Sequence, residues 1–296
     1  MQKEPLISVV IPTYNRANTI LKSVNSVLNQ TYKNIEVIVV DDCSTDDTEK
    51  IIAGIQDSRV KFYRLEKNSG ACTARNLGIE KASGKYIAFN DSDDKWLPEK
   101  LEKQLSFLLE NNCDITVCSM NVFEEVTEKK MYVFPDSAKL NGKKISFNEL
   151  LKYNCTSTQL IFGKEECFKN NLFDSSMPRF QDWDECLKLS KKYSLCFQNE
   201  ILVETFQQQD SITKNPQKGV KGMEMLFEKH KNDILSDPEI TESFFKKISS
   251  FTCRCKKNPV LEMSYIYKAK PNPINLVKLI MAKTGLYKLL FNLKNR

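Results

Sequence analysis

Short apolar runs and amphipathic stretches alternate through the first 90 residues of the chain. Apolar runs of strand length, rich in β-branched residues, occupy positions 6–11, 35–40, 60–64 and 86–89. Between these runs, apolar residues recur three or four positions apart, which is the spacing of a helix that buries one face. Strands and helices that alternate through short connections form parallel sheets with right-handed crossovers. The pattern therefore predicts an α/β fold with a mostly parallel sheet.

The alternation loosens beyond this region. Further elements are expected as strands at 114–120 and 131–134, a strand or loop at 156–162, and helices at 99–105, 147–153, 164–170 and 179–189. From about residue 218 the sequence is helical and charged, without strand alternation. We therefore predict two domains, an α/β domain over residues 1–217 and a helical region over residues 218–296.

Acidic residues follow two of the predicted strands directly. Asp41 and Asp42 end the second strand, and Asp91, Asp93 and Asp94 follow the fourth. Ligands of open α/β sheets bind at the carboxyl ends of strands, so both clusters are expected in one pocket. Crowded carboxylates need a cation or full solvation, and hard oxygen ligands suit a Mg²⁺ or Mn²⁺ ion that also holds phosphates. A solvated acidic turn is the alternative interpretation.

Composition and charge narrow the functional classes. The 296 residues are 41% hydrophobic and 28% charged, as in soluble globular proteins. A net charge of +6 without an arginine-rich or RNA-binding motif argues against a nucleic-acid partner. The chain enters its first strand directly and has no apolar run of the roughly 18–20 residues that span a bilayer, so we expect no signal peptide and a cytoplasmic location. The ten cysteines are then expected to be reduced thiols, and a single histidine disfavours structural zinc.

A series of short motifs resembles glycosyltransferase family 2, the inverting enzymes of GT-A fold that use nucleotide-activated sugars. The matching segments lie within about the first 215 residues, at 9–16, 26–32, 39–48, 68–70, 74–79, 91–98 and 181–184. Each segment alone is weak evidence, whereas their order and spacing are specific. The resemblance implies a GT-A-type, Rossmann-like, mostly parallel sheet flanked by helices and followed by a C-terminal helical extension.

The resemblance also implies a site for the donor nucleotide. Tyr14 resembles the family's base-stacking aromatic residue, with Pro12 and Thr13 shaping that wall and Asn15 beside it. Asp42 resembles the acid that accepts a hydrogen bond from a uracil ring, which favours UDP as the nucleotide. The alternatives are that Tyr14 packs in a turn and that Asp42 only caps the following helix.

The acidic cluster after the fourth strand resembles the family's metal and sugar site. Asp93 corresponds to the metal-binding acid, and Asp91 is expected on the side of the donor sugar or ribose and as a second metal ligand. Ser92 lies between them, Asp94 is expected to assist, and Arg75 falls where the family often has a basic residue near the donor. The implied cofactor is Mn²⁺ or Mg²⁺, with the nucleotide-sugar as co-substrate.

Asp182 resembles the catalytic base, and its alternative interpretation is an ordinary helix N-cap. A base that takes the proton of an attacking acceptor hydroxyl permits a single displacement, which inverts the anomeric configuration without an enzyme nucleophile. Asp41, Trp96 and Trp183 are interpreted as structural. Gln208 stands where many relatives carry a histidine near the diphosphate, which puts a third protein ligand of the metal in doubt.

The last 80 residues lie outside the resemblance. No acidic residue follows Glu262, and residues 275–283 and 286–291 mix lysines with apolar residues. We expect either a basic amphipathic segment on an anionic membrane surface or a helical cap on the catalytic domain or a second subunit. The expected partners are therefore a nucleotide-sugar donor, a glycan, lipid-linked or protein acceptor of surface polysaccharide synthesis, and peripherally a membrane; a homo-oligomer is compatible with the sequence.

Other classes fit fewer of the motifs. A receiver domain also has a strand that ends in two acids, but it leaves the second cluster and Asp182 unused. A nucleotidyltransferase usually carries a glycine-rich basic loop, which residues 12–16 are not. A dinucleotide-dependent oxidoreductase lacks its Gly-x-Gly-x-x-Gly motif after the first strand. A sugar-nucleotide-binding protein without turnover remains an alternative to the transferase.

Overall fold

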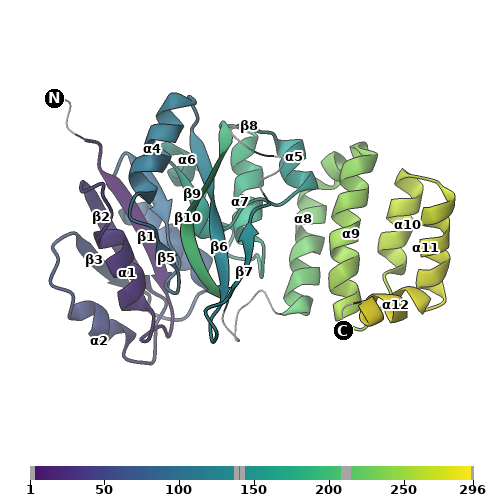
Figure 1. Cartoon of the computed structure of the whole chain (residues 1–296), viewed down its shortest axis with the longest axis horizontal. Coiled ribbons are helices and arrows are strands. Elements are labelled where there is room, and N and C mark those ends of the chain that lie inside the picture. The colour runs from purple at the N-terminus through teal and green to yellow at the C-terminus, as the bar shows by residue number, and fades with distance from the viewer. Residues whose placement is uncertain (1–3, 137–139, 141–143, 208–214, 295–296) are drawn as a thin grey trace. The chain divides into compact units, whose positions relative to one another are not determined.

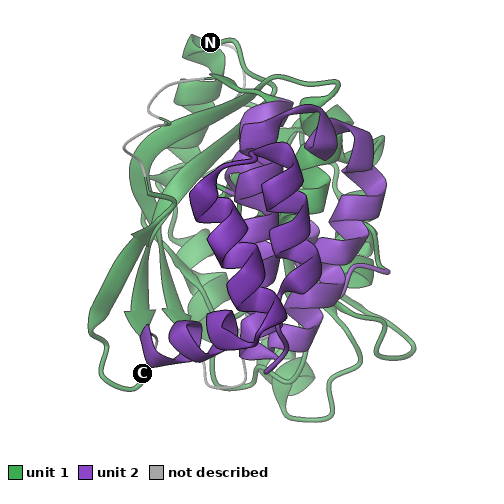
Figure 2. Ribbon diagram, turned by 90° about the vertical axis from the view of Figure 1, so that its right-hand side faces the viewer, with its two compact units in different colours: residues 1–146, 155–175, 182–208 green, residues 147–154, 176–181, 209–296 purple. Residues whose placement is uncertain are grey.

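The computed structural model describes residues 4–136, 140, 144–207 and 215–294. The chain divides into two compact units, which Figure 2 distinguishes by colour. Unit 1 contains residues 1–146, 155–175 and 182–208, and unit 2 contains residues 147–154, 176–181 and 209–296. The domain boundary between residues 217 and 218 stays a prediction.

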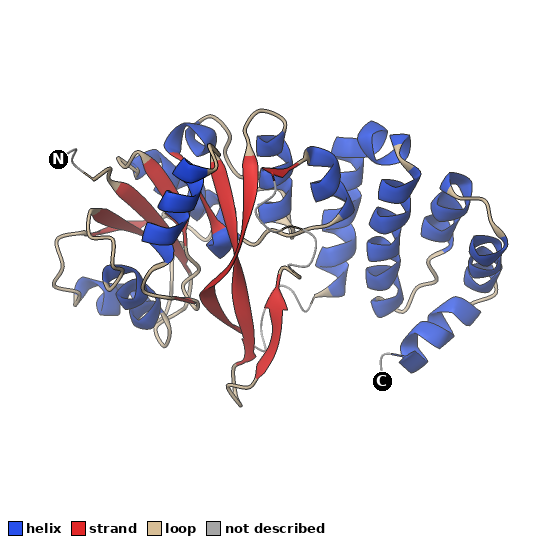
Figure 3. Cartoon of the chain, turned by 45° about the horizontal axis from the view of Figure 1, so that its top comes forward, coloured by secondary structure: helices blue, strands red, loops and turns tan. Residues whose placement is uncertain are grey.

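Unit 1 is built on a single sheet, visible in red in Figure 3. Its strands are β1 (Ile7–Thr13), β2 (Ile35–Asp41), β3 (Val60–Arg64), β4 (Tyr86–Phe89), β5 (Lys95–Trp96), β6 (Ile115–Glu124), β7 (Lys130–Phe134), β8 (Lys144–Ile145), β9 (Ile161–Lys164) and β10 (Leu195–Gln207). The main path runs β3-β2-β1-β4-β9-β6-β10-β5, with β7 beside β6 and β8 beside β10. The pairs among β1 to β4 and the β6–β10 pair are parallel, whereas β9 is antiparallel to both neighbours. The expected mostly parallel sheet is confirmed.

Helices flank this sheet (Figure 1). They are α1 (Ile20–Leu28), α2 (Thr48–Ala53), α3 (Ala71–Lys81), α4 (Lys100–Glu110), α6 (Glu165–Lys169) and α7 (Gln181–Ser190). One glycine sets the position of α3: a Cβ at Gly78 would lie 2.3 Å from a methyl carbon of Val10. Helix α3 therefore lies closer to β1 than any larger residue permits, and this contact carries Arg75 to the sheet edge.

The longest strand, β10, was not predicted from the sequence. Its apolar halves are separated by the polar pair Asn199 and Glu200, which hides a continuous strand pattern. In the structure the pairing with β6 shifts register between Phe197 and Ile201 and again before Val203. An irregularity of this kind accommodates the polar residues without ending the strand. The two-residue strands β5 and β8 are too short to leave any pattern.

The structure contains one disulfide, between Cys113 and Cys196. Cys113 follows α4 and Cys196 lies in β10, 83 residues further along the chain. The expectation that all ten cysteines are free thiols is therefore wrong for this pair. Their side chains are buried next to each other because β10, whose path was not predicted, runs beside β6.

The regular elements in the described part of unit 2 are helices. Its helices are α5 (Phe147–Lys152), α8 (Pro216–Ser236), α9 (Pro238–Arg254), α10 (Val260–Ala269), α11 (Pro273–Lys283) and α12 (Leu286–Lys294). Asn215, Asp237 and Asn272 cap α8, α9 and α11 by accepting hydrogen bonds from backbone N–H groups, and each is followed by a proline. This combination is the favoured start of a helix. Among residues 4–136, 140, 144–207 and 215–294, no helix is long and apolar enough to cross a bilayer.

Candidate active site

The donor loop predicted from the resemblance begins where β1 ends. Pro12 and Thr13 are buried in the last part of the strand, whereas 41% of the surface of Tyr14 is exposed. Asn15 has a positive φ of 50°, a conformation that asparagine tolerates better than most residues. Its side-chain oxygen accepts a hydrogen bond from the backbone N–H of Thr45 at 2.8 Å, which joins this loop to the one after β2. The ring of Tyr14 is thus presented to solvent on a braced turn.

The first acidic cluster, Asp41 and Asp42, is tied to the protein. The Asp41 side chain is fully buried and accepts hydrogen bonds from the backbone N–H and hydroxyl of Ser44, and Arg64 lies 3.2 Å away. Asp42 accepts backbone N–H hydrogen bonds from Ser69 at 2.6 Å and from Gly70 at 2.8 Å. Asp42 therefore holds the loop before α3, and the N-cap position of α2 is taken by Asp47.

Arg75 in α3 is the buried cation of the site. Its guanidinium donates a hydrogen bond to Asp91 at 2.8 Å and lies over the ring of Phe173. Burial alone would lower the pKa of Arg75, but the charges of Asp91, Cys72 and Asp182 raise it, so the side chain stays charged. The arginine predicted near the donor is therefore the contact between the acidic cluster and the region of Asp182.

In the second acidic cluster, Asp91, Asp93 and Asp94, arginine side chains face two of the three carboxylates. Asp91 faces Arg75, and Asp93 has its carboxylate 3.7 Å from Nε of Arg16. Asp94 is buried and accepts a hydrogen bond of 2.6 Å from the hydroxyl of Thr205. Burial and the neighbouring charges of Asp93 and Asp91 raise the pKa of Asp94 well above its usual value, although the hydrogen bond acts in the opposite direction.

Asp182 lies in the first turn of α7 and in the same unit as the acidic cluster. Burial raises the pKa of Asp182 to about 6, against the opposing effects of the Trp183 backbone N–H and of Arg75. Asp91 adds to the rise through its negative charge. The carboxyl group therefore titrates near neutral pH, where a general base works best.

The chemistry of the second cluster fits a divalent cation. Hard carboxylate oxygens are the ligands that Mg²⁺ and Mn²⁺ prefer. Burial is the largest cause of the raised pKa of Asp94, and the negative charges of Asp93 and Asp91, which a cation would offset, add to it. Among the described residues, no three histidine, cysteine or acidic side chains converge in the way a metal held by protein alone requires. Asp93 and Asp91 therefore fit as a partial ligand set that phosphate oxygens would complete.

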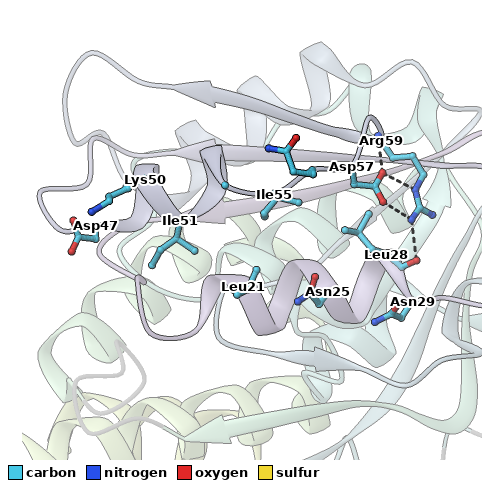
Figure 4. A pocket seen from close by; sticks show the side chains of 12 residues that line it. Leu21, Asn25, Leu28, Asn29, Asp47, Lys50, Ile51, Ile55, Asp57 and Arg59 are labelled. Carbon is cyan, nitrogen blue, oxygen red and sulfur yellow. Dashed lines mark hydrogen bonds and ion pairs between the residues drawn. The ribbon is translucent and has the colours of Figure 1, made fainter.

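A cavity lies between α1 and α2, lined by none of these residues (Figure 4). It has a volume of about 690 Å³ and is lined, among others, by Leu21, Asn25, Ile51, Asp57 and Arg59. At one end Arg59 donates two hydrogen bonds to Asp57 and one to the carbonyl of Leu28. None of the residues predicted for the site lines this cavity, and we assign it no ligand.

The sequence interpretation omitted two contacts of the site. Arg16 was part of a recognised motif but was not assigned to the acidic cluster, and Thr205 lies on the strand that was not predicted. The basic residue two positions after Tyr14 was the available signal for the first, and nothing local signals the second. Trp96 and Trp183 are both buried. Gln208 lies outside the described residues.

The fold and the acidic sheet edge define the class expected from the sequence, a GT-A-type α/β protein. The profile of the family described as "Glycosyl transferase family 2" matches residues 8–169. The chain belongs to glycosyltransferase family 2 and is a glycosyltransferase. The predictions of family and enzyme class are confirmed.

Relatives in this family cover most of the chain. TuaG of Bacillus subtilis, named a putative teichuronic acid biosynthesis glycosyltransferase, is 36% identical over 223 residues, which make up 74% of this chain and 85% of TuaG. WcaA of Escherichia coli, named a putative colanic acid biosynthesis glycosyl transferase, is 32% identical over 78% of this chain and 84% of its own length. WfgD of Escherichia coli, named a UDP-Glc:alpha-D-GlcNAc-diphosphoundecaprenol beta-1,3-glucosyltransferase, is 41% identical over 51% of this chain and 56% of WfgD.

Solved structures share the fold. Residues 1–349 of S. aureus TarS in complex with UDP-GlcNAc match with a TM-score of 0.65 at 18% identity, over 95% of this chain and 90% of that one. The same TarS fragment without that ligand matches with a TM-score of 0.62. The predicted GT-A fold with a C-terminal helical region is confirmed.

Proposed function

We propose that this glycosyltransferase moves a sugar from a UDP-sugar to an acceptor hydroxyl in the synthesis of a surface polysaccharide, with inversion and with a divalent metal. The observation that carries the proposal is the buried Arg75, which contacts Asp91 and also faces the charge of Asp182. A donor-side acid and a candidate base thus share one cation. UDP is supported by the exposed Tyr14 beside Asp42 and by the ligand named for TarS.

In this proposal the second acidic cluster holds the donor. Asp93 and Asp91 would hold Mn²⁺ or Mg²⁺, which when bound supplies charge stabilisation for the diphosphate leaving group. Arg16 pairs with Asp93 and Arg75 with Asp91, and both arginines are suited to the phosphate oxygens, because guanidinium groups bind them in a bidentate manner. Asp42 keeps the loop before α3 in place, and the remaining lone pairs of its carboxylate are suited to a uracil N–H.

Asp182 would act on the acceptor. A carboxylate with a pKa of about 6 is ionised at neutral pH and still basic enough to take a proton from a hydroxyl as that hydroxyl attacks. Arg75, held by Asp91, would orient Asp182 and keep the approach of the acceptor fixed with respect to the donor, which supplies part of the rate enhancement. One displacement with one base inverts the anomeric centre.

The acceptor class is supported by the relatives. TuaG and WcaA are named for teichuronic acid and colanic acid biosynthesis, and WfgD for a diphosphoundecaprenol-linked acceptor. We therefore favour a glycan or lipid-linked acceptor that is presented at a membrane, with the enzyme attached peripherally on the cytoplasmic side. A protein acceptor and a homo-oligomer are compatible with the same site.

The proposal is tested first by calorimetric titration of UDP with and without Mn²⁺. Binding that needs the metal in the wild type and is lost in Asp93→Ala supports the donor site. Asp57→Ala is the matched control, because the two side chains are similarly exposed, at 27% and 25%, and each pairs with an arginine. This control should bind UDP like the wild type.

Two outcomes would contradict the proposal. Absence of UDP binding with any metal would remove the uracil assignment of Tyr14 and Asp42, and other nucleotides would then be tried. Tight, metal-dependent binding without sugar transfer to any lipid-linked or glycan acceptor would instead favour a sugar-nucleotide-binding protein. Product analysis by NMR of the anomeric linkage checks inversion.

A further inference from the structure

Helix α12 exposes an apolar stripe to solvent. Leu286, Leu289, Leu290 and Leu293 follow the i, i+3, i+4, i+7 spacing that places side chains on one face of a helix. Between 44% and 57% of the surface of each leucine is exposed, and none of the residues of this helix is buried. A surface helix normally turns such a stripe to the core. Here the stripe points away from it.

Residues outside the leucine stripe attach α12 to the rest of unit 2. Lys288 donates a hydrogen bond to the carbonyl of Lys256, and the side chain of Tyr287 hydrogen-bonds with Ser249 of α9. Lys288 lies on the side of the helix opposite the leucines, and Tyr287, three positions before Leu290, lies at the edge of the stripe. The leucine stripe is therefore exposed by the way α12 is held rather than by a frayed end.

Helix α11 repeats the arrangement. Asn275 and Ala282, seven positions apart, are its buried residues. Ile274, Val277 and Ile280 are on the other side and are more than half exposed. The two helices follow each other through a turn at Gly285, whose φ is +83°. Two consecutive helices thus leave an apolar face without cover in the described part of the chain.

Charge distinguishes this segment from the rest of the protein. The chain has 44 Lys and Arg residues against 38 Asp and Glu residues, and seven of the cations but none of the acids follow Glu262. The first 262 residues, with 37 cations and 38 acids, are therefore close to neutral. The whole net positive charge of the protein belongs to the last 34 residues. On α11 and α12, Lys278, Lys283, Lys288 and Lys294 alternate with the exposed apolar residues.

We propose that the exposed apolar faces of α11 and α12 bind the surface of a bilayer that contains anionic lipids. Such a surface accepts leucine side chains at the acyl boundary and lysines at the phosphates, which matches both properties of the segment. A second copy of the chain would cover the leucines but would not match the lysines. A two-fold interface would set this face against itself, with cations opposite cations and no acid within the segment to pair with them.

The inference extends the proposed function and rests on it. An enzyme that acts on a lipid-linked acceptor needs to work at the membrane surface. Its evidence is nevertheless separate from the donor site. Vesicle binding tests the inference, and UDP binding with sugar transfer tests the proposed function, so failure of one is distinguishable from failure of the other.

The test is co-sedimentation of the full-length protein with two kinds of vesicle, one of phosphatidylcholine alone and one of phosphatidylcholine with phosphatidylglycerol. We expect binding to the anionic vesicles that weakens as salt is raised, because surface electrostatics are screened. Leu289→Asp/Leu293→Asp should bind about tenfold or more weakly, because charges replace two exposed leucines that would enter the acyl boundary on binding. Lys283→Glu/Lys294→Glu should lose the preference for anionic vesicles and keep weak binding to both kinds.

Leu109→Asp is the matched control, since Leu109 is 60% exposed on α4 and lies outside the segment. Circular dichroism and UDP binding of all variants separate a binding defect from unfolding. Equal binding of wild type and Leu289→Asp/Leu293→Asp would overturn the proposal, as would equal binding of the wild type to both kinds of vesicle. A wild-type dimer in sedimentation velocity that the leucine variant converts to monomer would assign the face to self-association instead and would equally overturn it.

Discussion

The negative charge of the two acidic clusters at the carboxyl edge of the sheet is compensated in different ways. In the first cluster, Asp41 and Asp42 accept hydrogen bonds from three backbone N–H groups and from the hydroxyl of Ser44, and Arg64 pairs with Asp41. In the second cluster, arginines face Asp91 and Asp93, and the pKa of Asp94 is raised by burial and by the charges of its two neighbours. Backbone N–H groups are fixed in place, whereas an arginine side chain can move from a carboxylate of the protein to a phosphate of a ligand.

This difference separates structure from ligand binding within one sheet edge. A carboxylate that is satisfied by nearby backbone N–H groups stabilises the fold and is a poor metal ligand. A carboxylate that is crowded by others is destabilised by charge repulsion until a cation binds to it. We therefore expect substitution of Asp41 to change stability, substitution of Asp42 to change stability and, through the proposed uracil contact, UDP binding, and substitutions in the second cluster to change ligand binding and turnover.

The largest effect is expected at Asp182, which faces the second cluster through Arg75. Asp182→Asn should lower kcat by about 10²–10⁴ because an amide cannot accept the acceptor's proton. Since burial raises the pKa of Asp182 to about 6 and the base must be ionised, wild-type kcat/KM should rise with pH up to about 6 and then level off. Sugar-transfer assays across pH check both, and an Asp182→Asn rate close to the wild type would refute the assignment.

A large loss of stability is expected at Asp41. Asp41→Asn should lower the free energy of unfolding by about 2–4 kcal/mol, because it removes a buried charge that Ser44 and Arg64 surround. Urea unfolding measures the change. If the fold tolerated Asn here while UDP binding failed, Asp41 would be a ligand contact and its contrast with the second cluster would break.

A somewhat smaller loss of stability is expected at Glu36. This residue lies at the other end of β2 from Asp41. Burial by itself would raise the pKa of Glu36, but hydrogen bonds from Lys61, Ser8 and Ser83 lower it from 4.5 to about 2. The stabilisation is therefore present above pH 4.5 and is lost as the pH falls toward 2. Glu36→Gln should cost about 2 kcal/mol at pH 7.

Urea unfolding of wild type and Glu36→Gln at several pH values checks this dependence. The difference between the two proteins should shrink as the pH falls from 4.5 toward 2. A constant difference over that range would mean that the carboxylate's charge contributes nothing and that only the shape of the side chain matters.

The smallest change in stability is expected at Asp93. Asp93→Asn removes one charge from a crowded cluster and should alter the free energy of unfolding by no more than about 0.5 kcal/mol in either direction, as at other partly exposed positions. The same variant should lose metal-dependent UDP binding. A stability loss as large as that of Asp41→Asn would mean that both clusters are structural.

The sequence by itself determined the α/β class, the parallel strands β1 to β4 and the helical C-terminal region, because hydrophobic periodicity is a local property of a few consecutive residues. It also predicted which carboxylates follow strand ends. The Asn199–Glu200 interruption concealed β10, because the strand is continuous only through its pairing with β6.

Tertiary structure decided which carboxylates are satisfied and which are crowded. Asp42 takes its donors from 27 and 28 residues along the chain, and Asp94 takes Thr205 from 111 residues away. It likewise decided that the leucines of α12 face outward, because Tyr287 and Lys288, which are not part of the leucine stripe, attach the helix to unit 2. The partners of a charge and the cover of an apolar face depend on distant segments, and no local pattern records them.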